Sequence, residues 1–343
     1  MTNQSASPRY SAEPPKEKLI TVCVAAYNGE STLSKALDSC LISDMAQLEV
    51  IIVDDGSTDQ TAILARKYIA MRPDTFRLIQ QPNGGYGSAI MTGLHNARGR
   101  YFRTLDCDDW FDKAALEQLL QYLKICSTDV VFTNYCTVQN DQVQRIFEVC
   151  NGFQAESTYT VDMLEQHELD MEIHGMTFHT EMLCNTGMSL PHHCRYTDMA
   201  YTFIGMSAAQ TVSFLPVTLY YYRLGRDGQS VSLENYQKHF DDYAKVTEQV
   251  LRHADEQPNS IKGNLLRNRA RDIAQHGIEL QLRFSPSSEV KKRLVAYDKS
   301  LRTHHPDIAH RMTNKNIRLL RASGYMMYRI AQRHAQKKIE LQE

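Results

Sequence analysis

"LDCDDW", residues 105–110, places the carboxylates Asp106, Asp108 and Asp109 directly after the apolar run 101–105, which predicts a buried strand. Like charges this close repel and raise each other's pKa unless a cation is shared between them. Mg²⁺ and Mn²⁺ prefer oxygen ligands and often keep substrate phosphates in their coordination shell. The stretch therefore predicts a site for a metal and a diphosphate at the end of a core strand. The alternative is a solvated loop in which one Asp caps the next helix.

On both sides of this stretch, short apolar runs alternate with helical patterns. Strands are predicted at 19–27, 48–53, 76–80, 101–105 and 129–135, and helices at 31–42, 58–71, 88–97 and 112–125. This alternation indicates βαβ units, so we expect an α/β fold with a mostly parallel sheet flanked by helices. Ligands of such sheets bind beyond the carboxyl ends of the strands. Polar residues follow four of the predicted strands and predict one common crevice: Tyr27-Asn28, Asp54-Asp55, Asn83-Gly84 and Asp106.

Composition sets limits on the class of protein. The formal net charge of −2 over 343 residues gives no sign of a nucleic-acid partner. Eight Cys without a CxxC pair indicate reduced thiols in a reducing compartment. Residues 1–18 are polar and Pro-rich, and we expect a disordered leader there, not a signal peptide. No apolar run reaches the roughly 20 residues of a bilayer span, so we expect a cytoplasmic protein, soluble or peripheral at the inner face of the cell membrane.

Two further strand endings carry candidate binding residues. In the run 54–59, the carboxylate of Asp55 can accept hydrogen bonds from a base N–H or a ribose hydroxyl, whereas Ser57 and Asp59 are better explained as turn and cap. The Gly-rich loop 83–88 precedes a predicted helix, where backbone N–H groups can contact an anion. This loop lacks the Lys of a Walker loop and is no GxGxxG motif, which disfavours a P-loop NTPase and a Rossmann dehydrogenase.

Four segments in this order and spacing resemble the family 2 glycosyltransferases of the GT-A fold: ITVCVAAYN (20–28), VIIVDDGSTD (50–59), NGGYGSA (83–89) and LDCDDW. The resemblance is strong over 19–125 and moderate over 170–232. It implies a GT-A nucleotide-diphospho-sugar transferase fold, a nucleotide-sugar donor and Mn²⁺ or Mg²⁺ as cofactor. Relatives often carry an Arg after the Gly-rich loop, where this chain has Ile90.

The resemblance also assigns roles on the donor side. Ala26 and Tyr27 would lie against the base, Asp55 would bind a uracil-type ring, Asp106 would face the ribose, and Asp108 and Asp109 would hold the metal. Arg226, in the turn after the aromatic strand 219–223, could supply the phosphate contact that Ile90 cannot make. The implied nucleotide-sugar-binding set is Ala26, Tyr27, Asp55, Asn83, Gly84, Asp106 and Arg226.

On the acceptor side, inverting transfer needs a base for the acceptor hydroxyl. The family places an Asp there, and Thr197-Asp198 resembles that position, with Asp198 as catalytic base at the start of a helix. Alternatively, Thr197 caps this helix and Asp198 only complements the helix dipole. His174 and His179 flank Thr177 in a segment that relatives place near the acceptor, and are predicted acceptor-side contacts.

After about residue 232 the pattern becomes helical and highly charged. We expect three regions: a leader (1–18), a catalytic domain (19–231) and a helical C-terminal region (232–343). Residues 311–338 carry eight Lys and Arg and no Asp or Glu. A basic amphipathic helix of this kind can lie on an anionic membrane. The alternative is a solvated helix packed on the protein itself or on a second subunit of a homo-oligomer.

The resemblance implies an inverting, metal-dependent glycosyltransferase. Such an enzyme would move a sugar from a nucleotide-diphosphate donor, with a UDP-sugar expected, to a hydroxyl of a polysaccharide, glycolipid or glycoprotein. Its partners would be the donor and a glycan or lipid-linked acceptor, with membrane contact through 311–338. The alternative is a non-catalytic nucleotide-sugar-binding or assembly subunit, tethered by its basic C-terminal helices.

Overall fold

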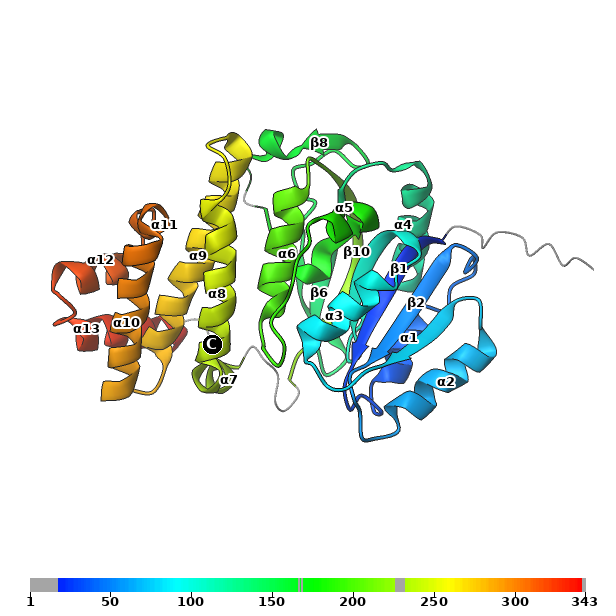
Figure 1. Ribbon diagram of the computed structural model, residues 1–343, viewed down its shortest axis with the longest axis horizontal. Coiled ribbons are helices and arrows are strands. Elements are labelled where there is room, and N and C mark those ends of the chain that lie inside the picture. The colour runs from blue at the N-terminus through cyan, green and yellow to red at the C-terminus, as the bar shows by residue number, and fades with distance from the viewer. Residues whose placement is uncertain (1–17, 166, 168, 226–231, 341–343) are drawn as a thin grey trace, which may run out of the picture.

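The chain forms an α/β part and, beside it, a group of helices built from its C-terminal third (Figure 1). The computed structural model describes residues 18–165, 167, 169–225 and 232–340, and the side chains up to 336. The predicted combination of an α/β fold with C-terminal helices is confirmed.

One mixed sheet organises the α/β part, in the order β3-β2-β1-β4-β9-β6-β10-β5, with β7 paired to β6 and β8 paired to β10. Strands β3, β2, β1 and β4 are mutually parallel, and β6 is parallel to β10. The strands are β1 (Lys18–Ala26), β2 (Leu48–Asp54), β3 (Phe76–Gln80), β4 (Gly99–Asp106), β5 (Trp110–Phe111), β6 (Val130–Gln139), β7 (Gln142–Phe147), β8 (Thr158–Thr160), β9 (Met176–His179) and β10 (Thr211–Arg223).

The central strands are apolar along almost their whole length because helices cover both faces of a parallel sheet. Every residue of β2 is buried, and Val24 of β1 lies opposite Ile52 of β2 and Leu105 of β4. The same register places Ala26 opposite Asp54 and Ala25 opposite Asp106. The polar endings of these strands therefore lie at one edge of the sheet.

Helices of the α/β part are α1 (Leu33–Ser39), α2 (Thr61–Met71), α3 (Tyr86–His95), α4 (Lys113–Ile125), α5 (Thr180–Asn185) and α6 (Thr197–Ala208). Asp112 caps α4 as the sequence predicts, since its carboxylate accepts from the Ala115 N–H at 2.8 Å. Helix α3 packs closely on β1 at Gly93, where a Cβ would lie only 2.2 Å from Cys23 Sγ.

Two strands depart from the sequence prediction. The short strand β9 inserts antiparallel between β4 and β6, and no local sequence pattern predicted it. Strand β10 begins at Thr211, eight residues before the predicted aromatic strand at 219, and its register against β6 shifts after Leu215. Tertiary pairing decides both features, since β propensity depends on the neighbours that a strand finds in the sheet.

Beyond β10 the described chain is helical: α7 (Leu233–Lys238), α8 (Phe240–Asp255), α9 (Ile261–Arg283), α10 (Ser288–His304), α11 (Pro306–His310), α12 (Lys315–Ala322) and α13 (Tyr328–Glu340). Helix α8 lies between α6 and α9 and buries one apolar face, which includes Phe240, Val246 and Val250 (Figure 1). Among the residues that the structure describes, no helix is both long and apolar enough to span a bilayer.

Candidate active site

The loops after β1 and β2 are cross-linked by side-chain hydrogen bonds. Ser57 Oγ accepts from the Asn28 N–H at 2.9 Å, and Asn28 Oδ1 accepts from the Thr58 N–H at 2.9 Å. Asp59 accepts from the Glu30 N–H at 3.1 Å and from the Thr61 N–H, at 3.0 Å, at the start of α2. Ser57 and Asp59 thus fix loop shape, in line with the turn-and-cap interpretation, and leave Tyr27 exposed beside the buried Ala26.

Asp55 anchors the Gly-rich loop. Its buried carboxylate accepts from the N–H groups of Gly84 and Gly85 at 2.8 Å each, and from Gln81 Nε2 at 2.7 Å. Gly56 adopts a φ of +76°, where a Cβ would lie 2.8 Å from the backbone N of Asn83. Asp55 therefore holds the neighbouring loop in place, a role that the sequence prediction of base binding did not include.

The acidic stretch after β4 is held by two tyrosines and by the end of β10. The Tyr86 hydroxyl donates to Asp106 Oδ1 at 2.6 Å, and the Tyr220 hydroxyl donates to Asp109 Oδ2 at 2.7 Å. Arg223 donates its backbone N–H to Asp109 Oδ1 at 2.8 Å and its Nε–H to the Asp108 carbonyl at 3.0 Å. The acidic loop is thereby tied to α3 and β10.

Burial and mutual repulsion perturb these carboxyls. Burial, followed by the charge of Asp108, raises the pKa of Asp106 to about 7. Burial and the charges of Asp106 and Asp108 raise the pKa of Asp109, which is 0% exposed, well above its usual range. Burial also raises the pKa values of the Tyr86 and Tyr220 hydroxyls, which therefore remain protonated donors. A divalent cation would relieve the repulsion among the carboxylates.

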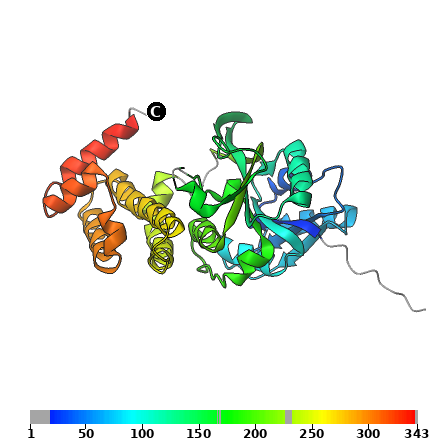
Figure 2. The same ribbon diagram turned by 90° about the horizontal axis from the view of Figure 1, so that it is seen from above.

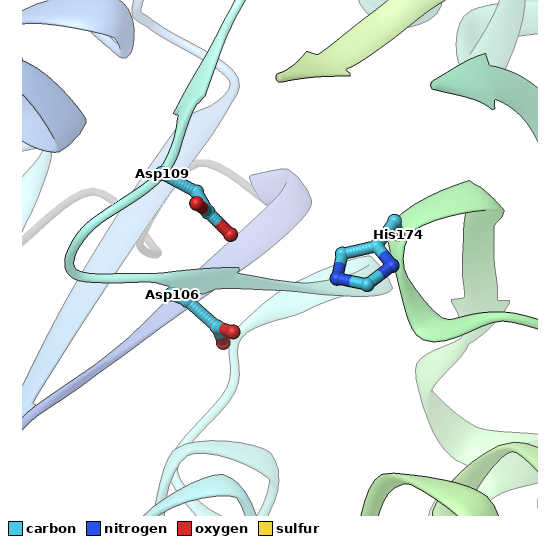
Figure 3. A group of neighbouring side chains, drawn as sticks. All are labelled: Asp106, Asp109 and His174. Atoms are coloured by element: carbon cyan, nitrogen blue, oxygen red, sulfur yellow. The ribbon is translucent and has the colours of Figure 1, made fainter. Parts of the chain in front are cut away.

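His174 faces Asp106 and Asp109 from the turn before β9 (Figure 3). One ligand atom from each of these three residues lies within 4.8 Å of the others. Burial lowers the pKa of His174 to about 4, so its ring is neutral and keeps a lone pair for ligation. Two carboxylate oxygens and one imidazole nitrogen form a donor set that fits a divalent cation.

This geometry distributes the acidic residues differently from the sequence prediction. The group contains Asp109, which was predicted as a metal ligand, together with Asp106, which was assigned to the ribose, and His174, which was assigned to the acceptor. Asp108, predicted as a ligand, is outside the three-residue group, although its charge acts on both neighbouring carboxyls. Asp108 and Asp109 follow the end of β4, where the alternation of side chains along a strand no longer applies, so the sequence alone did not show which carboxylates lie near His174.

Asp198 is the second residue of α6, in the first turn of the helix. Burial, followed by the charge of Glu172, raises the pKa of Asp198 to about 6, and its own N–H and that of Met199 oppose the shift. The charge of Asp198 also contributes to the raised pKa values of Asp106 and Tyr86, so the carboxylate is an electrostatic neighbour of the acidic loop.

Thr197 does not cap α6. The residue at the cap is Tyr196, with a φ of 62° and no side-chain capping bond. The Thr197 hydroxyl is buried and makes no hydrogen bond within the described residues. A Cβ at Gly87 would lie 3.0 Å from Thr197 Oγ1, so α3 and the start of α6 are in close contact.

The two predicted acceptor-side histidines are separated. His179 pairs with Tyr101 near the beginning of β4, which is the opposite edge of the sheet from Asp106. The centroids of the His179 and Tyr101 rings are 5.5 Å apart in an edge-on arrangement. His179 therefore lies away from the acceptor side, where it was predicted. Because β9 runs antiparallel to β4, the turn before β9, which carries His174, lies at the carboxyl edge and His179 does not. Arg226 lies outside the described residues.

Sequence reasoning missed Tyr86, Tyr220 and Arg223 as site residues. Tyr86 lies within the Gly-rich motif, but its partner Asp106 is 20 positions away. Tyr220 and Asp106 are 114 positions apart, and their contact depends on the strand order. Ile90, at the position where relatives often carry an Arg, is 0% exposed in α3. Within the described part of the chain, Arg223 contacts the acidic loop. Its guanidinium lies 5.1 Å from the centroid of the Trp110 ring.

Comparison with known proteins agrees with this geometry. The family model described as glycosyl transferase family 2 matches residues 21–180. Residues 21–180 of the chain thus carry a glycosyl transferase family 2 domain. The match covers the strands and loops that carry Asp55, Asp106 and Asp109 and extends to His174.

Among relatives, EpsH of Bacillus subtilis is 28% identical over 226 residues, which cover 60% of this chain and 60% of EpsH. Glycosyltransferase GlyA of Streptococcus pneumoniae is 31% identical over 140 residues, 41% of this chain and 20% of GlyA. The chain thus spans less than two thirds of the length of these relatives. The solved structure of S. aureus TarS 1–349 with UDP-GlcNAc has a TM-score of 0.68 at 19% identity and covers 94% of this chain and 90% of the TarS chain. The predicted GT-A fold is confirmed.

Proposed function

We propose that this family 2 protein is an inverting glycosyltransferase that moves a sugar from a UDP-sugar to a hydroxyl of a polysaccharide, glycolipid or glycoprotein, with Mn²⁺ or Mg²⁺ as cofactor. The observation that carries the proposal is the concentration of Asp106, Asp109 and Asp198 at one end of the sheet, where burial and neighbouring negative charges raise their pKa values. Such unfavourable carboxylate clusters are typical of catalytic and metal sites.

On the donor side, Asp106, Asp109 and His174 would hold the cation, which would neutralise the diphosphate leaving group. The loops after β1 and β2, with Ala26, Tyr27 and Asp55, would receive the base, and backbone groups of Asn83 and Gly84 would line the same side. The relative TarS has been solved with UDP-GlcNAc, which makes this nucleotide sugar the first donor to test.

On the acceptor side, Asp198 would take the proton from the acceptor hydroxyl. The hydroxyl oxygen would form a bond to the anomeric carbon while the bond from that carbon to the diphosphate oxygen breaks, with its electron pair leaving on the diphosphate. The raised pKa of Asp198, about 6, is still below neutral pH, so the ionised base is the major form at pH 7 and has the proton affinity that general-base catalysis needs. The acceptor would be a glycan or a lipid-linked saccharide at the inner face of the cell membrane.

A non-catalytic nucleotide-sugar-binding subunit is the weaker alternative. It would have no need for a carboxylate at Asp198 whose pKa is raised toward neutrality. The two proposals predict different behaviour toward a donor supplied without acceptor, because a transferase passes the sugar slowly to water and a binder does not.

The test is release of UDP from UDP-GlcNAc, UDP-glucose and UDP-galactose with Mn²⁺, measured with and without oligosaccharide acceptors. Asp198→Asn is expected to keep UDP affinity and to lose at least about a hundredfold in rate, the usual scale for a general base. The wild-type rate should fall as pH drops through about 6, because Asp198 becomes protonated.

The matched control is Asp241→Asn, which removes another carboxylate from the first turn of a helix, the exposed start of α8. This variant should behave as wild type. Full turnover by Asp198→Asn would refute the assignment of the base, and UDP binding without any release by the wild-type protein would favour the binding subunit.

A further inference from the structure

The turn into α13 and the first turns of that helix carry a surface that belongs to neither the donor site nor the acceptor site. We define the α13 face as Met326, Arg329, Ile330 and Arg333, which are all exposed and recur at helical spacing. Met326 is 84% exposed, the largest value among the large apolar side chains of the described residues, and Ile330 is 42% exposed. Two exposed apolar side chains thus share this face with two arginines.

The opposite side of α13 is packed, so the orientation of this face is fixed. Tyr328 and Ala331 are buried, and Gln332 Nε2 donates to the Phe284 carbonyl at 3.1 Å and to the Tyr328 hydroxyl at 3.2 Å. Burial of these residues holds the helix on the end of α9. The α13 face consequently points away from the protein.

The segment that carries this face is basic. No Asp or Glu occurs between Arg311 and Lys338. Asp298, which contacts this region, is 1% exposed and is bound by Arg321 at 2.6 Å and by the Tyr325 hydroxyl at 2.7 Å. Lys291 of α10 adds a positive charge 5.9 Å from the centroid of the Tyr328 ring.

We propose that the α13 face binds an anionic membrane surface. Arginines at the level of the headgroups attract anionic lipid, while apolar side chains between them enter the boundary of the acyl region. A basic face alone would suit any polyanion, but the exposed Met326 and Ile330 require in addition a partner whose apolar groups replace water around them, and an anionic bilayer offers both.

The position of the face in the molecule agrees with this partner. Helices α12 and α13 lie at the end of the molecule far from the sheet, as both views show (Figures 1 and 2). The inference goes beyond the proposed transfer reaction and does not depend on it.

The test is cosedimentation of the full chain with vesicles of phosphatidylcholine alone and with about 30 mol% phosphatidylglycerol. Binding to the anionic vesicles is expected, with at least tenfold weaker binding to the neutral ones and a loss in about 0.5 M NaCl. Each arginine near an anionic surface contributes about a fivefold change, so Arg329→Gln/Arg333→Gln should weaken binding about 25-fold. Met326→Gln/Ile330→Gln should weaken it by at least tenfold.

The matched control is Lys67→Gln/Arg72→Gln, which removes the same charge from exposed positions on and just after α2. This variant should bind within twofold of wild type, and thermal melting should show that all variants are folded. Equal loss in both charge variants, or no binding to anionic vesicles, would overturn the proposal. Binding to a 30-base-pair DNA as tight as to the vesicles would assign the face to nucleic acid instead.

Discussion

Asp55→Asn tests whether this carboxylate fixes the Gly-rich loop. The substitution keeps the size of the side chain but removes its charge and replaces one acceptor oxygen with an NH₂ group. In the wild-type protein one oxygen accepts from Gly84 and Gln81, and the other accepts from Gly85. In the variant, the half-buried N–H of Gly85 would face a second donor.

The magnitude follows from these three bonds. Hydrogen bonds to a charged group contribute about 1.5–3 kcal/mol each, against about 0.5–1.5 kcal/mol for neutral pairs, and a buried unsatisfied donor costs about 1–3 kcal/mol. Two bonds weakened to neutral strength and one lost give an expected decrease of about 3–5 kcal/mol in the free energy of unfolding. That is a large fraction of the total stability of an ordinary domain.

Urea unfolding followed by tryptophan fluorescence measures this change, because Trp110 is the single Trp of the chain and lies in the α/β part, between the acidic loop and α4. The control is Asp141→Asn, the same chemical change at a carboxylate that is 85% exposed and paired with Lys35 at 3.1 Å. Its effect should stay within about 1 kcal/mol, as for other surface ion pairs. A loss below about 1 kcal/mol for Asp55→Asn would refute the anchoring role.

Two further predictions concern the acidic cluster and the approach of α3 to α6. Because the pKa values of Asp106 and Asp198 are raised, the stability that these groups contribute is fully present below their ordinary pKa and is lost as pH rises through about 6 and 7. Melting of EDTA-treated protein should therefore show a stabilisation by Mn²⁺ that is larger at about pH 8 than at about pH 5, and an equal shift at both would contradict the assigned ligands. Gly87→Ala should place a Cβ 2.9 Å from Leu190 Cβ and 3.0 Å from Thr197 Oγ1, so we expect a loss of about 1–3 kcal/mol in urea unfolding together with slower transfer, because the start of α6 carries Asp198. Unchanged UDP release by this variant would show that the contact does not position the base.

Local sequence patterns were sufficient to predict the alternating strands and helices of the α/β part. The apolar runs predicted β1 to β4 and β6, and the helices between them appeared within a few residues of their expected limits. The polar endings of those strands predicted that Asp55 and Asp106 would lie at the same edge of the sheet, since parallel strands place their carboxyl ends at one edge. The strands, helices and polar strand endings depend on hydrophobic periodicity and turn residues, which involve only a few neighbouring positions of the chain.

The tertiary structure decided which of these residues face one another. His174 and His179 look equivalent in the sequence, yet the antiparallel insertion of β9 brings one to the acidic loop and takes the other to the far edge. The bonds from Tyr220 to the acidic loop span more than 100 positions. Contacts of this kind follow from strand order and direction, which depend on the packing of the whole sheet and are absent from any local pattern.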